Sequence, residues 1–275
     1  NGGSIPRSDL PLTINLDEKE LDRTTVYVAP GATEVVRRRV TIPKAGSVVL
    51  SASIGPSGMT SDDLAMLALD VIDPIRVVAI TSESSKQTQR PSPDFSGDTD
   101  YLRLALTPFA MSKDKGEDAF RLRVYSQNDW PDLDKRDRVV VLADVTKLDE
   151  RRVRELEQFI FAGGGLLIAP GARTEPKFWN QWFWRDGSGL APAPIESIKS
   201  AGDDVIRLVG VVSSNEIFSF FAGRPDPLPP VSVLRWARFW PVQPGAVLAS
   251  LQSGDPMIVH RPFGRGRVVA LAVPI

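Results

Sequence analysis

Short runs of apolar or alternating residues, separated by turn residues, fill the first 74 positions. Turn signals such as Ala29-Pro30-Gly31 and Pro43-Lys44-Ala45-Gly46 separate five of these runs: Leu12–Leu16, Thr25–Val28, Glu34–Ile42, Ser47–Ile54 and Leu64–Ile72. Leu64–Leu69 also has a helix-favouring composition, but we favour a strand there. Short strands with regular Pro and Gly punctuation are typical of two packed antiparallel sheets. The pattern predicts an all-β, immunoglobulin-like sandwich domain over residues 1–74.

The hydrophobic pattern changes at residue 75, where unbroken apolar runs begin to alternate with helical periodicity. Arg76–Thr81 and Arg138–Ala143 are continuous apolar runs, as expected of parallel strands that are buried on both faces. Tyr101–Phe109 has apolar residues at helical spacing, and Phe120–Tyr125 alternates as a strand. The alternation predicts an α/β domain with a parallel, flavodoxin-like sheet over residues 75–275.

The best-defined helix of the sequence runs from Leu148 to Ala162. One apolar stripe follows the helical period and consists of Val153, Leu156, Phe159 and Ile160. Thr146 is the expected N-cap, with Asp149 three residues later. Gly163-Gly164-Gly165 follows the helix and precedes the apolar run Leu166–Pro170. These glycines close a helix instead of opening one, so they predict a C-cap and a tight turn, not a phosphate-binding loop.

The C-terminal part reads as a short aromatic helix, a Pro-rich loop and several strands. The helix is expected over Pro176–Trp184 and the loop over Arg224–Pro230. The strands are expected over Val231–Trp240, Ala246–Leu251, Pro256–Arg261 and Arg267–Val273, the last two forming a hairpin. The sequence ends at Ile275 directly after a predicted strand, which indicates that it is part of a longer protein.

Composition excludes several kinds of chemistry. The chain has 33 basic and 34 acidic residues, a net charge of −1, no cysteine and one histidine, His260. The charge balance argues against a nucleic-acid partner. Without cysteine there is no disulfide, thiolate metal site or cysteine nucleophile, and one histidine disfavours zinc sites and a Ser-His-Asp triad. We expect neither a metal nor a cofactor. No apolar run reaches the length of about 18 residues needed to span a bilayer.

The carboxyl ends of two predicted parallel strands carry the candidate site. Asp144 follows the strand Arg138–Ala143, and Pro170, Gly171 and Arg173 follow the next strand. Open α/β sheets bind ligands at this edge, so these four residues predict a ligand-binding crevice. A catalytic nucleophile would stand at the strand-to-helix turn, where Ala, Pro and Gly have no reactive group. For Asp144 we favour a second role over ligand binding, which is to help cap the following helix.

The tryptophans and the single histidine suggest two further hypotheses about function. Five tryptophans lie in two stretches, and exposed together they would form a glycan-stacking platform: Trp179, Trp182, Trp184, Trp236 and Trp240. Buried, they would instead pack a short helix onto the sheet, and we favour that reading. His260 would serve as a general base only with a nucleophile beside it, and no serine or carboxylate at a diagnostic spacing supports one.

Two stretches of the sequence carry a family resemblance. Residues 138–170, with the strand, helix and Gly163-Gly164-Gly165 turn, resemble the central unit of class I glutamine-amidotransferase-like domains. Residues 256–273, with the hairpin turn Gly264-Arg265-Gly266, resemble the closing strands of the same domains. The chain is most similar to the divergent version found in BatA-like bacterial membrane proteins, together with a preceding β-sandwich. In that alignment the catalytic cysteine of true amidotransferases falls near Pro170.

The resemblance implies a location and a functional class. BatA-like proteins carry transmembrane helices, so this segment is expected to face the periplasm or cell exterior, anchored by helices outside it. Because the cysteine is absent, no catalytic residue is transferred. We therefore expect a non-catalytic interaction or structural module with protein partners in the cell envelope. The alternatives are a domain that binds a small molecule or glycan in the crevice, and a hydrolase without a cysteine mechanism.

Overall fold

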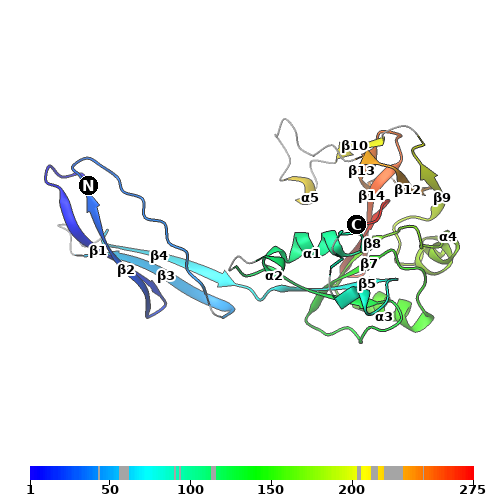
Figure 1. The fold of residues 1–275 in the computed structure, drawn as a ribbon, viewed down its shortest axis with the longest axis horizontal. Helices are drawn as coiled ribbons and strands as arrows, with labels where there is room; N and C mark the ends of the chain where they lie inside the picture. Colours follow the sequence, from blue (N-terminus) through cyan, green and yellow to red (C-terminus); the bar gives the residue numbers. More distant parts are fainter. Residues whose placement is uncertain are drawn as a thin grey trace. The chain divides into compact units, whose positions relative to one another are not determined.

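The chain folds into two compact units in the computed structural model (Figure 1). The N-terminal unit is Asn1–Asp73 and the C-terminal unit is Pro74–Ile275, whereas the sequence placed the boundary at residue 74. The structure describes residues 1–42, 44–55, 62–89, 91–92, 94–112, 116–202, 206–211, 216–219, 232–243 and 245–275. The loop expected over Arg224–Pro230 lies outside these ranges.

The N-terminal unit is one antiparallel sheet of four strands in the order β2-β1-β3-β4. The strands are β1 (Arg7–Leu16), β2 (Lys19–Val28), β3 (Gly46–Ile54) and β4 (Leu64–Val71). Leu64–Leu69 is a strand, as favoured above. No strand forms over Glu34–Ile42, where Arg38 instead forms an ion pair with Asp22 of β2 at 2.7 Å. The predicted two-sheet sandwich is therefore wrong for this unit.

The error in the sandwich prediction has a simple physical origin. Alternation of apolar and polar residues indicates that one face of a strand is apolar, but it does not indicate which segment covers that face. Among the described residues of the N-terminal unit, only Leu16 and Ser51 are buried. The described residues of the unit therefore form one layer of a sandwich, and no second sheet is found among them.

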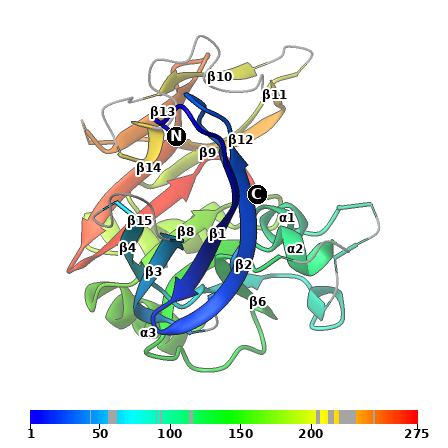
Figure 2. The ribbon, with the colours of Figure 1, turned by 90° about the vertical axis from the view of Figure 1, so that its left-hand side faces the viewer.

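The C-terminal unit contains a nine-stranded sheet in the order β11-β10-β13-β14-β15-β8-β7-β5-β6. Its strands are β5 (Ile75–Thr81), β6 (Phe120–Ser126), β7 (Asp137–Ala143), β8 (Gly165–Ala169), β10 (Ile206–Val211), β11 (Ser232–Val233), β13 (Val247–Leu251), β14 (Pro256–Phe263) and β15 (Gly266–Leu271). A separate two-stranded sheet pairs β9 (Ile195–Ser200) with β12 (Arg235–Phe239). In Figure 2, β10 and β13 lie towards one end of the large sheet and β6 at the other.

The large sheet is mixed, so the flavodoxin-like, glutamine-amidotransferase-like parallel fold predicted from the sequence is wrong. Strands β6, β5, β7, β8 and β15 are parallel, whereas β14, β13, β10 and β11 continue the sheet in antiparallel pairs. An apolar strand pattern does not encode strand direction. Short connections such as the β14–β15 hairpin allow only antiparallel pairing, and this hairpin was predicted correctly.

Helices cover parts of the large sheet. They are α1 (Asp100–Leu106), α2 (Pro108–Met111), α3 (Glu150–Phe161), α4 (Pro176–Phe178) and α5 (Glu216–Ser219), with a π-helical turn over Trp179–Trp184. The predicted helix α3 is confirmed, but its N-cap is Asp149, which accepts a hydrogen bond from the Arg152 amide at 2.8 Å. Gly163, with a φ of +117°, ends the helix as predicted.

Strand β5 shows how the central strands are buried on both faces. Val78 and Ile80 belong to the core cluster that contains Leu156 and Ile160 of α3. Val77 and Ala79 belong to the cluster on the other side, which contains Leu102 of α1. The continuous apolar run of β5 therefore reflects two packed faces, and it holds the end of the strand in a fixed position.

Candidate functional site

Three strands of the large sheet end at the same edge, and polar residues lie there. β5 ends with Thr81, Asp144 follows β7, and Pro170 follows β8. Because β5, β7 and β8 are parallel neighbours, their carboxyl ends bring these residues together. This is the edge at which the sequence predicted a crevice.

Asp144 is a buried acidic group of this edge, with 5% of its side chain exposed. Its carboxylate accepts hydrogen bonds from the Arg173 amide at 2.9 Å, the Thr174 amide at 3.0 Å and the Thr174 hydroxyl at 3.1 Å. Its backbone is left-handed, with a φ of +47°, a conformation that Asp tolerates better than most residues. Asp144 therefore caps the turn after β8, and the favoured prediction that it caps α3 is wrong, because the N-cap of α3 is Asp149.

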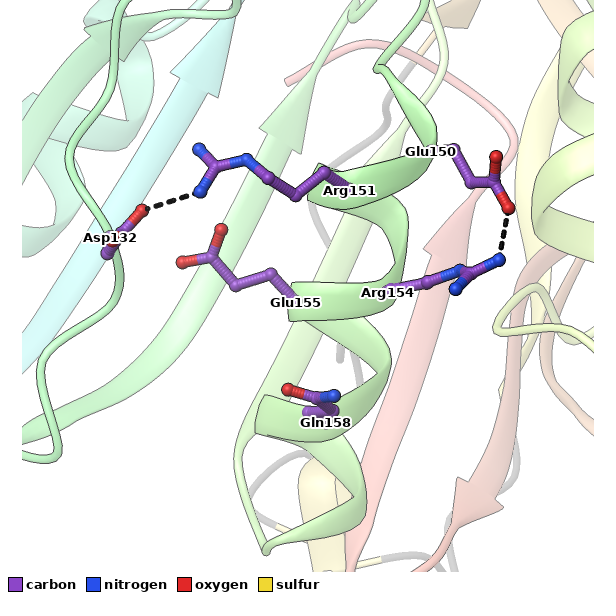
Figure 3. A pocket seen from close by; sticks show the side chains of 6 residues that line it. All are labelled: Asp132, Glu150, Arg151, Arg154, Glu155 and Gln158. Carbon is purple, nitrogen blue, oxygen red and sulfur yellow. Dashed lines mark hydrogen bonds and ion pairs between the residues drawn. The ribbon is translucent and has the colours of Figure 1, made fainter.

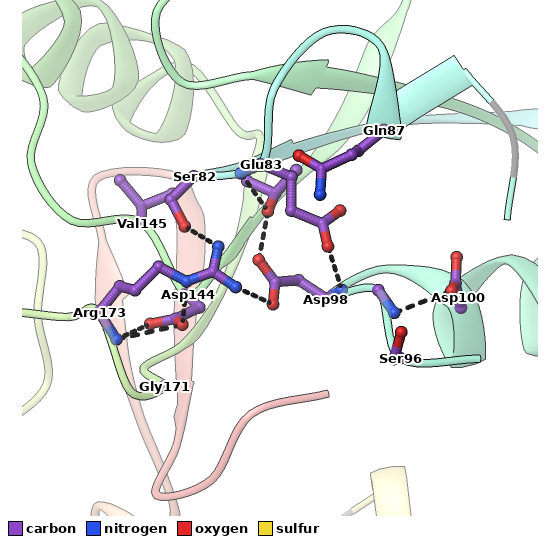
Figure 4. A network of polar contacts seen from close by, with 12 residues as sticks. Ser82, Glu83, Gln87, Ser96, Asp98, Asp100, Asp144, Val145, Gly171 and Arg173 are labelled. Carbon is purple, nitrogen blue, oxygen red and sulfur yellow. Dashed lines mark hydrogen bonds and ion pairs between the residues drawn. The ribbon is translucent and has the colours of Figure 1, made fainter. Parts of the chain in front are cut away.

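Arg173 connects all three strand ends through its guanidinium group (Figure 4). Nη1 donates to the Ser82 hydroxyl at 2.8 Å, and Nη2 donates to Asp98 Oδ1 at 3.1 Å. Nε forms an ion pair with Asp144 Oδ2 at 3.4 Å. One cation, placed after β8, thus links the segment after β5 to the residue after β7.

Two further carboxylates, which the sequence analysis missed, complete this network. Asp98 accepts a hydrogen bond from the Thr81 hydroxyl at 2.6 Å, and Glu83 accepts one from the Asp98 amide at 3.1 Å. Thr81 and Glu83 could have been found, because they follow a buried strand as Asp144 does. Asp98 lies at the end of an irregular stretch, and no spacing relates it to a strand end. We call Thr81, Ser82, Glu83, Asp98, Asp144 and Arg173 the strand-end network.

Burial dominates the electrostatics of two members of the strand-end network. It raises the pKa of Asp98, although the hydrogen bond from Thr81 and the charge of Arg173 both lower it. Burial also raises the pKa of Glu83, against the opposing hydrogen bond from the Asp98 amide. The negative charges of Asp98 and Asp144 act on each other and add to the shift at Asp98. The strand-end network therefore contains three carboxyl groups, those of Glu83, Asp98 and Asp144, but only one guanidinium group, that of Arg173.

The raised pKa of Asp98 makes a pH-dependent contribution to stability. The folded chain holds the Asp98 proton to a higher pH than the unfolded chain, whose pKa is about 4. Stability should therefore fall as the pH rises from about 4 through the raised pKa, and the loss should persist at neutral pH. Asp98→Asn removes this titration. We expect the stability difference between variant and wild type, measured by urea unfolding, to shift towards the variant as the pH rises. A difference that does not change with pH contradicts this assignment.

Pro170 and Gly171 face a different environment from the two charged residues. They line a cavity of about 430 Å³ whose other walls include Ile198, Trp236 and Val273. The cavity is mainly apolar, and neither Asp144 nor Arg173 lines it. Gly171 lies between the two environments, because a Cβ at this position would be 2.4 Å from Asp144 Cγ. The predicted crevice thus divides into an apolar cavity and a self-paired polar network.

The tryptophans do not form one exposed platform. Trp179 and Trp236 are buried, with 1% and 6% exposed, and Trp182 and Trp184 are partly buried. The Trp179 indole donates to the Ala193 carbonyl at 2.9 Å, and its ring lies 5.8 Å from that of Phe239. Of these five tryptophans, Trp240 is the exposed one, at 56%. The aromatic stretch Pro176–Trp184 mainly packs in the core, as the favoured reading predicted.

His260 lies on β14, and its Nδ1 is buried without a hydrogen-bond partner among the described residues. The cavity beside it has a volume of about 340 Å³. Its described lining consists of Trp184, Gly187, Pro192, Gln243, Gly245, Ala246, Arg261 and Pro262 along with His260 itself. This lining contains no hydroxyl, thiol or carboxylate. The imidazole therefore has no nucleophile to activate within the described part of the cavity.

The outer surface of α3 forms a larger hollow of about 630 Å³ (Figure 3). Only charged and amide side chains line it: Asp132, Glu150, Arg151, Arg154, Glu155 and Gln158. Arg151 forms an ion pair with Asp132 at 3.4 Å, and Arg154 forms one with Glu150. These pairs are typical of a solvated helix face, and they offer a ligand no enclosed apolar surface.

A metal-binding cluster and a membrane-spanning helix are both absent from the described residues. These residues contain no group of three or more His, Cys, Asp or Glu side chains placed to hold a metal ion. In the described ranges no helix combines the length and the apolar character needed to cross a membrane.

Comparisons with known proteins show similarity at the level of the fold. The sequence matches no family model and no curated protein. Two solved structures cover 73% of this chain and 88% of their own: the cytoplasmic proteins STM1381 of Salmonella typhimurium LT2, 14% identical with a TM-score of 0.52, and STM3548 of Salmonella typhimurium, 11% identical with a TM-score of 0.51. The chain also spans 31% of an exo-β-1,4-mannosidase from an Opitutaceae bacterium, at 15% identity and a TM-score of 0.44.

Proposed function

We propose that this chain is a non-catalytic protein-interaction module and that its N-terminal unit carries the binding surface. The observation that supports this proposal is an apolar region on one face of the β2-β1-β3-β4 sheet, over which the described residues of the unit place no second sheet. Residues paired directly across neighbouring strands point to the same face, so the register of β1, β3 and β4 defines an apolar set, beside which β2 places Thr24, Asp22 and Lys19 on the same face. We call this set the apolar sheet face: Leu12, Ile14, Leu16, Val48, Leu50, Ala52, Ile54, Ala65, Leu67 and Leu69.

The opposite face of the same sheet has a different character. Its residues include six polar ones, namely Thr13, Asn15, Ser47, Ser51, Ser53 and Asp70, together with the exposed apolar side chains of Val49, Leu64 and Met66. The Ser47 hydroxyl donates to the Asp70 carboxylate at 2.5 Å. This face is therefore mixed in character, whereas every member of the apolar sheet face is apolar.

Most members of the apolar sheet face are nevertheless half-buried instead of fully buried. Leu16 is its only buried member, and Leu67 is 55% exposed. An isolated sheet gains stability by packing an apolar face against another layer. Burial is worth roughly 25 cal/mol per Å², and contiguous exposed apolar patches are typical of interaction sites. We infer that a protein partner covers this face.

The chemistry of the C-terminal unit supports the non-catalytic part of the proposal. The charged groups of the strand-end network bind one another, and Pro170 and Gly171, which directly follow β8, carry no nucleophile. These self-paired charges also disfavour the alternative ligand-binding role for Asp144 and Arg173. We further propose a location outside the cytoplasmic membrane, with partners in the cell envelope. That location rests on the resemblance of residues 138–170 and 256–273 to BatA-like proteins.

Site-specific cross-linking tests the proposal, since the chain has no cysteine of its own. Leu67→Cys and Met66→Cys place a single thiol on opposite faces of β4, at neighbouring positions that are 55% and 67% exposed. Each variant is labelled with benzophenone maleimide and irradiated with membranes of the source organism. We expect a discrete protein adduct from position 67, competed by unlabelled chain, and none from position 66. Equal labelling at both positions, or no adduct at position 67, contradicts the proposal.

A further inference from the structure

We propose that the cavity of about 340 Å³ beside β14 binds a small aromatic carboxylate and that the guanidinium group of Arg261 holds the carboxylate. This binding site goes beyond the interaction function proposed above, because it lies in the other unit and uses other residues. Three observations support it: the guanidinium group is fixed on one side, its other edge is free, and the described lining supplies no acid to pair with it.

The cavity lies away from the strand-end network. Arg261 pairs with Val268 of β15, and Val268 pairs with Leu166 of β8. Leu166 is near the start of β8, whereas the strand-end network lies at the ends of β5, β7 and β8. The Arg261 cavity is therefore a second site and not a part of the crevice that the sequence predicted.

Backbone carbonyls hold the guanidinium group of Arg261 from one side. Its Nη1 donates to the Gly187 carbonyl at 2.9 Å and to the Gly189 carbonyl at 3.0 Å. The Ala191 carbonyl is a third, more distant acceptor at 3.4 Å. Gly187 has a φ of +87°, a left-handed conformation that glycine adopts readily. The turn after Trp184 thus fixes one nitrogen of the group in place.

The other edge of the same guanidinium group is free. Nε and Nη2 form this edge, and neither has a hydrogen-bond or ion-pair partner among the described residues. The two N–H groups of such an edge are parallel and match the two oxygens of a carboxylate. Arg261 therefore presents a two-donor edge whose orientation is set in advance by the bonds to Nη1.

The charge of Arg261 has no counter-ion in the described lining of the cavity, which contains no carboxylate. Burial lowers the pKa of Arg261, because the protein solvates the charged guanidinium group less well than water does. The carbonyl dipoles offset part of this cost, and a bound anion would offset more of it. Arg261 is also the only Lys or Arg of the described lining. One cation matches a carboxylate, with one negative charge, better than a phosphate ester, which carries about two.

The remaining lining suits an apolar, planar ligand body. Trp184, Pro192, Ala246 and Pro262 contribute to it. The indole of Trp184 lies close to the carbonyl turn, because a Cβ on Gly187 would be 3.6 Å from Trp184 Cη2. Aromatic rings pack favourably against one another, and the volume is near the lower end for ligand cavities. We therefore infer a ligand of about the size of benzoate.

Benzoate binding to the full chain labelled with 5-fluorotryptophan tests the inference by ¹⁹F NMR. Benzoate should shift the Trp184 resonance, assigned with Trp184→Phe, and the shift should saturate. The resonance of Trp130, which does not line the cavity, should not move. Benzamide has the same shape without the charge, and we expect it to bind about ten-fold more weakly or worse.

Two variants identify the group that binds the carboxylate. Arg261→Lys keeps a cation that can donate to the carbonyl turn but lacks the two-donor edge, so benzoate should bind about ten-fold more weakly. Arg121→Gln removes an exposed cation from the edge strand β6, and it should leave the dissociation constant within about two-fold. Circular dichroism checks that both variants fold. If Arg261→Lys does not fold, the comparison of benzoate with benzamide on the wild type decides.

Three results would overturn the inference. Benzoate could leave the Trp184 resonance unchanged, or benzamide could shift it at the same concentrations. Arg261→Lys could also bind benzoate as tightly as the wild type, in which case another group holds the carboxylate. None of these results affects the proposed function, because the cross-linking at Leu67 reports on the N-terminal unit alone.

Discussion

Replacing Gly266 with alanine is expected to destabilise the C-terminal unit by about 4 kcal/mol, because the new methyl group has no space. Gly266 begins β15, and a Cβ there would lie 2.2 Å from the carbonyl oxygens of both Ile160 and Gly164. Both are backbone atoms, so a change of side-chain rotamer cannot relieve the contact. The Arg265 amide also donates to the Phe161 carbonyl at 3.0 Å, which holds the hairpin turn against the end of α3.

Gly165→Ala provides a matched control for Gly266→Ala. Gly165 starts β8 and pairs with Arg267 of β15. Its Cβ would meet its nearest neighbour, Val139 Cγ2, at 3.5 Å, which is an ordinary contact. We expect this variant to change stability by less than about 1 kcal/mol. Urea or thermal unfolding of both variants is the measurement. Similar effects at positions 165 and 266 would show that the hairpin does not approach α3 as closely as described.

Replacing Asp144 with alanine is expected to lower the stability of the C-terminal unit by about 3 kcal/mol. The carboxylate is the shared acceptor for the amides of Arg173 and Thr174 and for the Thr174 hydroxyl. Without it, partly buried donors lose their partner, and each unsatisfied donor costs about 1–3 kcal/mol. Alanine also tolerates the left-handed backbone at position 144 less well than aspartate does.

Asp144→Asn separates the hydrogen-bonding role of this residue from its charge. Asparagine keeps one acceptor oxygen and accepts a left-handed backbone, so we expect it to cost about 1 kcal/mol. Unfolding in urea measures both variants. If Asp144→Ala lowered the stability no more than Asp144→Asn does, the strand-end network would not stabilise the fold. Its charges would then be available for a ligand, and the binding alternative would gain support.

The strand-end network shows why a position at a sheet edge does not by itself reveal a role. Sequence reasoning places Asp144 and Arg173 at the carboxyl ends of parallel strands, and the structure brings them to an ion-pair distance of 3.4 Å. It cannot reveal that Arg173 also reaches Asp98, because that contact joins segments 75 residues apart. The tertiary fold turns an expected ligand crevice into a set of mutually satisfied groups.

Local pattern by itself determined the elements that depend on nearby residues. The stripe of Val153, Leu156 and Ile160 identified α3, and the flanking glycines marked its end. The runs at Arg76–Thr81 and Arg138–Ala143 identified strands that are buried on both faces. The absence of cysteine and the single histidine excluded thiol chemistry and disfavoured triad chemistry. In each case the physical cause acts within a few residues, so it can be read from the chain.

Only the tertiary structure decided strand direction, layer number and the partners of the polar groups. The apolar runs of β14 and β8 look alike, yet a hairpin makes β14 antiparallel to β15, while β8 is parallel to it. Alternation in β1, β3 and β4 predicted an apolar face, but not whether a second sheet of the same chain would cover it. These properties depend on segments distant in sequence, and binary patterning encodes the need for burial without naming the surface that provides it.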